Sequence, residues 1–145
     1  MTQFRHRFVD DIPDQLEPGV LYVSLENDTV LHLCACGCGN ETVTPLAPTE
    51  WRMSYDGESV SLHPSIGNWS FDCQSHYFIT NGLVRWAPKW SKEEIERGRA
   101  YDRALKDMYY DAKTDAAPVP VVEPAAAQVP GKRGFRAWLA RLFGS

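Results

Sequence analysis

Three of the four cysteines in this chain lie within one glycine-rich stretch, CACGCG, as Cys34, Cys36 and Cys38. The fourth, Cys73, follows much later, in the segment FDCQSHYFI. Thiolates prefer soft ions such as Zn²⁺, and four sulfurs complete a tetrahedral structural site. Because sulfurs in such a site lie about 3.8 Å apart, the chain must curl between the cysteines, and Gly37 permits the positive φ that curling needs. We therefore predict a zinc site formed by all four cysteines.

A second ligand set stays open from the spacing alone, in which His76 replaces Cys34 beside Cys36, Cys38 and Cys73. We favour four sulfurs because the cysteine count then closes with none left over. A disulfide explains the pattern poorly, because a cytosolic chain keeps its thiols reduced and residues two apart rarely reach disulfide geometry. Reduced cysteines packed as small apolar side chains would suit Cys73, but not three thiols in one turn.

Two short segments carry hydroxyl and imidazole groups that could react. The segment LHPSIGNW contains His63 and Ser65, and CQSHYFI contains Ser75 and His76. A metal bound at Cys73 would hold His76 three residues from a fixed point, and a fixed imidazole near a hydroxyl is what activation of a serine requires. We predict Ser65 as the nucleophile and His76 as its base. His63 remains an alternative base, and Ser75 equally suits a hydrogen-bonding role in a turn.

Several neighbours could support this pair. Gly67 and the adjacent amides could stabilise an oxyanion, and Asp72 or Asn68 could orient the imidazole of His76. His32 precedes the cysteine turn, where its side chain could hold a metal ligand in place.

Turn dipeptides and alternating polarity predict the elements that position these groups. Asn27-Asp28, Asp56-Gly57 and Asn81-Gly82 each separate two alternating runs, which is typical of β-hairpins, and we interpret Asp56-Gly57 as a type I′ turn. The expected strands are 20–25, 29–33, 41–46, 51–55, 58–62, 76–80 and 83–86. Residues 1–18 are polar and contain two prolines, so we expect an irregular lead-in. The sequence thus predicts a small, mainly-β, zinc-stabilised core over about residues 19–90.

The pattern changes after this core. Ser91 and Glu94 form a capping box, S-x-x-E, that predicts a helix to about residue 112, docked on the sheet through an apolar stripe. Residues 113–131 are a Pro/Ala linker, and residues 132–145 form a short basic amphipathic helix on a flexible tail. That helix suits a membrane surface, a partner groove or its own domain. The fold class is α+β, with residues 1–112 as the folded domain.

Composition argues against a nucleic-acid-binding, secreted or membrane-spanning protein. The chain has 145 residues, of which 43% are hydrophobic and 23% charged, and its net charge is −4, so no broad nucleic-acid footprint is expected. The N-terminal segment lacks the apolar region of a signal peptide, and no apolar run is long enough to span a membrane. We therefore expect a cytoplasmic protein.

Three motifs, taken in order, resemble one bacterial family. CACGCG, HPSIG and CQSHYFI are similar to the patterns C-P-C-G-C-G, L-x-P-S-I and C-x-S-H-[FY]-[FW]-I of the BubE family, whose members occur beside Bub ubiquitin-like conjugation genes. The likeness covers about residues 30–88, and Ala35 stands where the family has proline. The resemblance implies zinc bound by the four cysteines, a reactive polar set of Ser65, Ser75 and His76, and a role in ubiquitin-like conjugation of the kind used in antiphage defence.

We weigh three functions. The first is a zinc-stabilised serine peptidase or isopeptidase that processes or deconjugates a bacterial ubiquitin-like protein. The second is a zinc-ribbon-like adaptor, without catalysis, that binds the ubiquitin-like protein or its conjugating enzymes. The third makes zinc catalytic, which thiolate-rich ligation disfavours because four sulfurs leave no open position.

Overall fold

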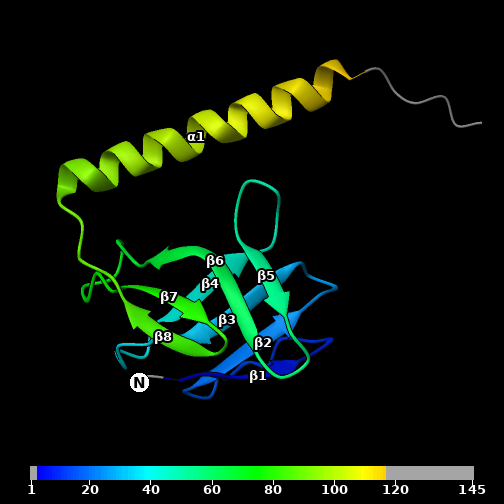
Figure 1. Ribbon diagram of the computed structural model, residues 1–145, viewed down its shortest axis with the longest axis vertical. Helices are drawn as coiled ribbons and strands as arrows, with labels where there is room; N and C mark the ends of the chain where they lie inside the picture. The colour runs from blue at the N-terminus through cyan, green and yellow to red at the C-terminus, as the bar shows by residue number, and fades with distance from the viewer. Residues whose placement is uncertain (1–2, 117–145) are drawn as a thin grey trace, which may run out of the picture. The chain divides into compact units, whose positions relative to one another are not determined.

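The structure, a computed structural model, describes residues 3–116, which form two four-stranded sheets followed by one helix (Figure 1). The first sheet has the strand order β1-β2-β3-β4. Its strands are β1 (Arg5–Phe8), β2 (Val20–Ser24), β3 (Thr29–Leu33) and β4 (Glu41–Pro45). The second sheet has the order β5-β6-β7-β8. Its strands are β5 (Arg52–Tyr55), β6 (Val60–Gly67), β7 (His76–Thr80) and β8 (Leu83–Trp86).

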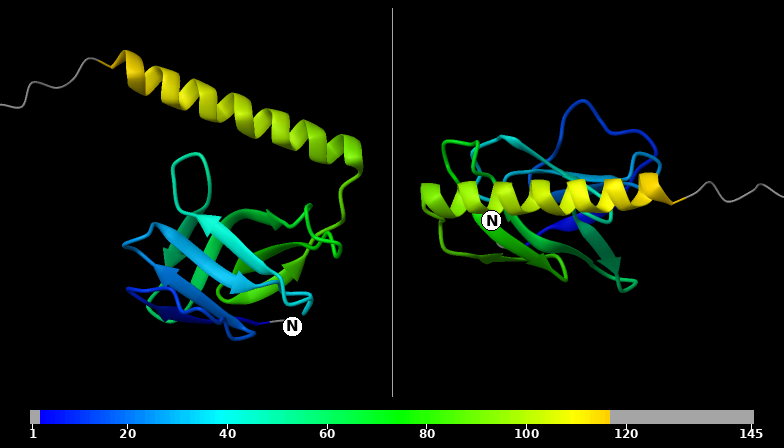
Figure 2. Two further views of the ribbon diagram at one scale, coloured as in Figure 1. Left: turned by 180° about the vertical axis from the view of Figure 1, so that it is seen from behind. Right: turned by 90° about the horizontal axis from the view of Figure 1, so that it is seen from above.

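The two sheets share one hydrophobic core. The blue to cyan strands of the first sheet and the green strands of the second lie against each other in Figure 1 and, seen from behind, in Figure 2. The first sheet contributes Leu21, Val23 and Val30, and the second contributes Val60, Leu62, Ile66, Tyr77 and Ile79. This shared burial supplies most of the driving force that holds the sheets together.

The hairpins confirm the expected mainly-β fold with one following helix. Asn81 and Gly82 both have positive φ, 50° and 73°, as a type I′ turn requires. The turn at Asp56-Gly57 differs from the predicted type I′ turn. Four residues separate β5 from β6, and among them only Gly57 has positive φ. There the Asp56 carboxylate accepts hydrogen bonds from the N–H groups of Glu58 and Ser59, at 2.9 and 2.7 Å, and it stabilises the longer loop.

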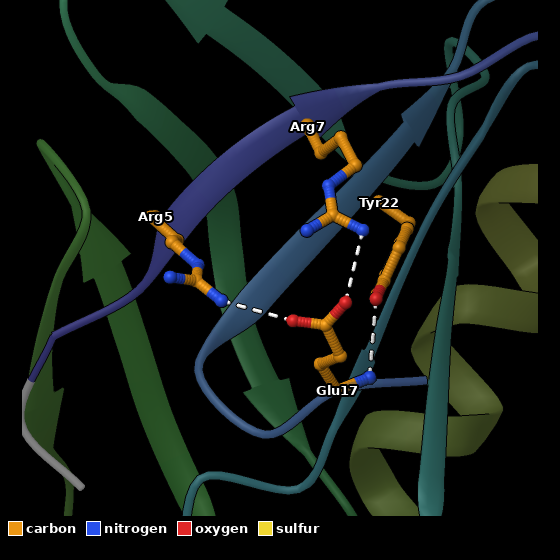
Figure 3. Close-up of polar contacts among 4 residues, drawn as sticks. All are labelled: Arg5, Arg7, Glu17 and Tyr22. Carbon is orange, nitrogen blue, oxygen red and sulfur yellow. Dashed lines mark hydrogen bonds and ion pairs between the residues drawn. The ribbon is translucent and has the colours of Figure 1, made fainter. Parts of the chain in front are cut away.

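The prediction of an irregular lead-in is wrong for β1, which pairs in parallel with β2. Its sequence, RHRF, lies at an exposed edge and lacks apolar alternation, so it carries little local strand pattern. Side chains hold it instead: Arg5 and Arg7 donate to the two carboxylate oxygens of Glu17 at 2.9 and 3.1 Å, and the Glu17 N–H donates to the Tyr22 hydroxyl (Figure 3). The two guanidinium groups lower the pKa of Glu17, with Arg7 the stronger influence.

Helix α1 (Lys92–Asp115) begins at the predicted capping box. The Glu94 carboxylate accepts the Ser91 N–H at 2.7 Å, and the Ser91 hydroxyl accepts the Glu94 N–H at 3.2 Å. Ile95 is buried, and Lys106 pairs with Glu50, whereas most of the predicted stripe is exposed. The predicted docking through the whole stripe is therefore not found in this structure, because Ile95 is its buried member and Tyr101 and Met108 are exposed.

The helix ends three residues inside the predicted linker. Most of that linker and the predicted amphipathic helix, from residue 117 on, lie outside the described residues. Within residues 3–116 no helix is long and apolar enough to cross a membrane.

Candidate functional site

The four cysteines come together where the β3–β4 loop of the first sheet meets the β6–β7 loop of the second. Cys34 follows β3, and Gly37 and Gly39, with φ of 87° and 81°, curl the chain back toward β4. Cys73 reaches the same place from the loop between β6 and β7. The Cys34 backbone N–H donates to the carbonyl of Asn40 at 2.8 Å, which closes the turn. The predicted meeting of two distant segments is therefore present in the structure.

The sulfur spacing fits a tetrahedral ion. Sγ of Cys34 lies 3.4 Å from that of Cys36 and 3.9 Å from that of Cys73, and Cys38 Sγ also lies 3.9 Å from Cys73 Sγ. All four sulfurs lie within 4.8 Å of one another. A tetrahedral zinc site needs about 3.8 Å between sulfurs. The four cysteines could hold a metal ion, and the rival set with His76 is not brought together, because that imidazole is engaged elsewhere.

The pKa values of these thiols diverge. Desolvation, followed by hydrogen bonds from the neighbouring thiols, raises the pKa of Cys36 to about 12. Desolvation acts on Cys73 in the same direction but is outweighed there by hydrogen bonds from Ser75 and from two thiols, which lower the pKa of Cys73 to about 7.

A buried polar network supports the cysteine cluster from behind. The Asn68 amide nitrogen donates to Ser75 Oγ at 3.0 Å and to the Tyr77 hydroxyl at 3.3 Å, and Ser75 Oγ lies 3.0 Å from Cys34 Sγ. The Tyr77 hydroxyl also lies 2.9 Å from His32 Nε2. Burial lowers the pKa of His32 to about 3, so its imidazole is neutral at physiological pH. Ser75 is thus a buried hydroxyl in contact with Cys34 and Asn68, and the partner of His32 Nε2 is Tyr77.

Ser65 and His76 face each other across β6 and β7. His76 Nε2 lies 3.0 Å from Ser65 Oγ, and His76 Nδ1 lies 2.7 Å from the carbonyl oxygen of Pro88. A carbonyl can only accept, so Nδ1 must carry the ring proton of the neutral imidazole. Nε2 is then the acceptor for the Ser65 hydroxyl proton. This is the tautomer in which a histidine can act as a general base toward a serine.

Two tryptophans cover the His76 ring. The ring centroids of Trp69 and Trp90 lie 5.0 and 5.4 Å from that of His76, and the two indoles stack at 5.3 Å. Two glycines make room for them. A Cβ at Gly67 would lie 2.4 Å from Trp69 Nε1, and one at Gly98 would lie 2.8 Å from the Trp90 ring. As a result His76 is only 6% exposed.

The other predicted groups are not part of this arrangement. His63 is exposed on β6 opposite Arg52, and Asn68 belongs to the network behind the cysteines. His76 Nδ1 bonds to neither Asn68 nor Asp72. Pro88 and Trp90 could not be assigned to the site from the sequence, because a backbone carbonyl has no signature in the residue types and a single tryptophan before a helix shows nothing of what it covers.

Comparison of the sequence with known protein families identifies the family of this chain. A family model described as "Bacterial ubiquitination-like system serine protease (BubE)" matches residues 8–87. No curated protein and no solved structure matches the chain. The matched segment contains the four cysteines, Ser65 and His76, and ends just before Pro88. The match covers more than half of the chain and agrees with the three motifs, so this protein belongs to the BubE family, whose description is a serine protease of a bacterial ubiquitination-like system.

Proposed function

We propose that this protein is a serine peptidase or isopeptidase that processes a bacterial ubiquitin-like protein or removes it from its conjugates. The observation that carries the proposal is the hydrogen-bonded pair of Ser65 and His76, 3.0 Å apart, with the imidazole held in the reactive tautomer by Pro88. The family description supplies the pathway, and the bond joining the substrate's C-terminal glycine to its neighbour is the expected target.

The chemistry follows from the positions of two atoms. Ser65 Oγ attacks the glycine carbonyl carbon while His76 Nε2 takes the hydroxyl proton. The imidazolium then gives that proton to the leaving amine, the C–N bond breaks, and an ester to Ser65 remains. Water attacks the ester carbonyl and loses a proton to Nε2, and the imidazolium passes this proton to Ser65 Oγ as the ester C–O bond breaks, which releases the acid product and restores the serine and the neutral imidazole. The Pro88 carbonyl keeps Nδ1–H in place throughout and favours the imidazolium through its dipole.

Zinc bound by Cys34, Cys36, Cys38 and Cys73 would have a structural role. Four thiolates fill the coordination sphere, so the ion would supply cross-linking between the β3–β4 turn and the β6–β7 loop. That loop ends at His76, three residues after Cys73. The cross-link therefore acts on the position of the base, while the proton transfers belong to Ser65 and His76 alone.

The test is cleavage of a fusion between the system's ubiquitin-like protein and a C-terminal reporter domain. We expect Ser65→Ala and His76→Ala each to lower the cleavage rate by at least about 10³-fold, because removing either member of such a pair removes the activated nucleophile. Ser54→Ala is the matched control, since Ser54 is an exposed serine on β5. If the folded Ser65→Ala variant still cleaves while chelation stops cleavage, a catalytic metal replaces this proposal. Binding of pathway proteins without any cleavage would favour the adaptor function.

A further inference from the structure

A groove of about 290 Å³ lies beside the reactive pair, between the edge strand β4 and the end of β6. Gly67 lines it, and this glycine is two residues from Ser65 and directly opposite His76 in the β6–β7 ladder. Val43 lines the opposite wall, and Trp51 and Trp69 also line the groove. The groove therefore touches the same strand that carries the nucleophile.

The backbone of Val43 faces this groove. In an antiparallel ladder, pairs that exchange hydrogen bonds alternate with pairs whose N–H and C=O groups point away from the partner strand. The bonds Leu46 N–H to Asp28 O, 2.7 Å, and Cys34 N–H to Asn40 O, 2.8 Å, fix which β3–β4 pairs exchange bonds. Val43 falls between them and opposite Leu31, so its N–H and C=O point outward.

Pro45 agrees with this register. It lies two residues from Val43 on β4 and therefore also faces outward, where a residue without an N–H costs the ladder nothing. Within its sheet β4 pairs only with β3, and the outward carbonyl of Pro45 accepts the Trp51 N–H at 3.1 Å, so among the described residues the open part of this edge lies at Val43.

The backbone of Gly67 also faces away from its partner strand. The Asn68 N–H donates to the Ser75 carbonyl at 2.9 Å, which places the bonding pairs of β6 and β7 on either side of the pair Gly67–His76. The Ala87 N–H donates to the His76 carbonyl at 2.8 Å, so the His76 backbone faces β8 rather than β6. On the other side, the pairing of β6 with β5 ends at His63. Within residues 3–116 no strand pairs with Gly67 on the groove side.

We propose that the extended C-terminal tail of the substrate lies in this groove as an added strand, hydrogen-bonded to the outward backbone groups of Val43 and Gly67. This inference rests on the proposed function, and it names how the substrate reaches Ser65. Open strand edges bind extended peptides through main-chain bonds, with little regard for side chains. The Trp69 indole fills the space above Gly67, where even a Cβ would lie 2.4 Å from its nitrogen. Trp69 thus packs directly on Gly67 in the lining of the groove, and a tail with glycine next to the scissile bond suits a position bordered by an indole ring.

The test uses the full chain and a defined probe, acetyl-Leu-Gly-Gly joined to aminomethylcoumarin. Val43→Pro removes the groove-facing N–H without removing a ladder bond, as Pro45 already illustrates, and Val43→Thr is the matched variant that keeps the N–H. We expect Val43→Pro to raise KM for the probe about five- to tenfold, the value of one backbone hydrogen bond, and Val43→Thr to stay within about twofold of wild type. Thermal melting checks that both variants fold.

Two further measurements separate the groove from the chemistry. A small alkyl fluorophosphonate, which needs no tail, should label Ser65 at the same rate in all three proteins. Sarcosine in place of one glycine of the probe removes a tail N–H, so it tests the complementary hydrogen bond, from the tail to a groove carbonyl, without any protein variant and should lower kcat/KM by a similar factor.

Each outcome has one meaning. If the fluorophosphonate labels Ser65 but the probe is not cleaved, or is cleaved equally well by Val43→Pro and in its sarcosine form, the groove inference is overturned and the proposed function stands. If the reagent does not label Ser65, the proposed function fails and the groove loses its role with it.

Discussion

The carbonyl oxygen of Pro88 lies 2.7 Å from His76 Nδ1, and this contact determines which imidazole nitrogen faces Ser65. A backbone acceptor thus occupies the place that a carboxylate takes in a Ser-His-Asp triad. Pro88 lies immediately beyond the segment matched by the family model, at the approach to α1. The residues that lead into the helix are consequently part of the candidate site.

Because a backbone carbonyl orients His76, catalysis by Ser65 and His76 should not depend on a nearby carboxylate. Asp72→Asn should leave kcat for fusion cleavage within about twofold of wild type, whereas loss of the acid from a carboxylate triad costs about 10⁴-fold. The measurement is kcat for both proteins at pH 7. A drop of a hundredfold or more in Asp72→Asn would show that this carboxylate, not Pro88, orients His76.

Gly98 permits a prediction in which stability and activity move in opposite directions. Gly98→Ala should raise the helix stability by about 1 kcal/mol, because alanine favours the helix interior. Its Cβ would lie 2.8 Å from the Trp90 ring, so the indole must shift and its contact with the His76 ring is disturbed. We expect kcat to fall several-fold with KM unchanged.

The matched control for this variant is Tyr101→Ala on the same helix, where Tyr101 is 65% exposed. It should leave kcat unchanged. Trp90→Phe should retain more activity than Trp90→Ala, because a smaller ring still covers the imidazole. Equal activity in Gly98→Ala and wild type would remove Trp90 from the account.

The cysteine cluster predicts one bound metal ion per chain. Cys38→Ser removes one of the four sulfur ligands and should weaken metal binding. Cys38 is in the β3–β4 loop, and its sulfur lies 3.9 Å from that of Cys73 in the β6–β7 loop. We expect elemental analysis to find stoichiometric zinc in wild type and a large loss in the variant, with a melting temperature lower by about 10 °C or more. Activity and melting should fall together. Loss of the metal with unchanged melting would contradict a structural role.

The buried network behind the cysteines should be costly to interrupt. Tyr77→Phe deletes the hydroxyl that contacts both His32 and Asn68, and it leaves two buried polar groups without that partner. We expect the free energy of unfolding to fall by about 1–3 kcal/mol in a denaturant titration. Tyr110→Phe, at an exposed position, is the control and should be neutral. An unchanged midpoint for Tyr77→Phe would mean that the network contributes nothing to stability.

The ion pairs at β1 give a pH dependence with a defined sign. Arg7 and Arg5 hold the pKa of Glu17 below its ordinary value of 4.5, so the carboxylate stabilises the fold above that pH and the stabilisation is lost as pH falls through the lowered pKa. Glu17→Gln should therefore melt below wild type at pH 7, and the difference should disappear in acid. A difference that persists at low pH would exclude an ionic origin. The contribution is small, because the group is exposed to solvent.

Local pattern predicted much of this molecule. Asn81-Gly82 specified its turn, Ser91 and Glu94 specified the helix start, and the glycine-flanked thiols meet Cys73 as expected. These features succeed because each depends on neighbouring residues or on chemistry that few residue types can perform.

The remainder depends on contacts that the sequence does not encode locally. Strand β1 exists through parallel pairing and the ion pairs to Glu17, neither of which leaves a periodic pattern. Every residue except proline offers the same backbone groups, so neither the Pro88 acceptor nor the outward-facing Val43 and Gly67 can be recognised before the strand register is known.

The most direct test of the central claim is peptide mapping by mass spectrometry after reaction with an alkyl fluorophosphonate. We expect a single adduct on Ser65, formed at least about a hundredfold more slowly in His76→Ala. An adduct on another serine, or no adduct in a protein that cleaves its fusion substrate, would contradict it.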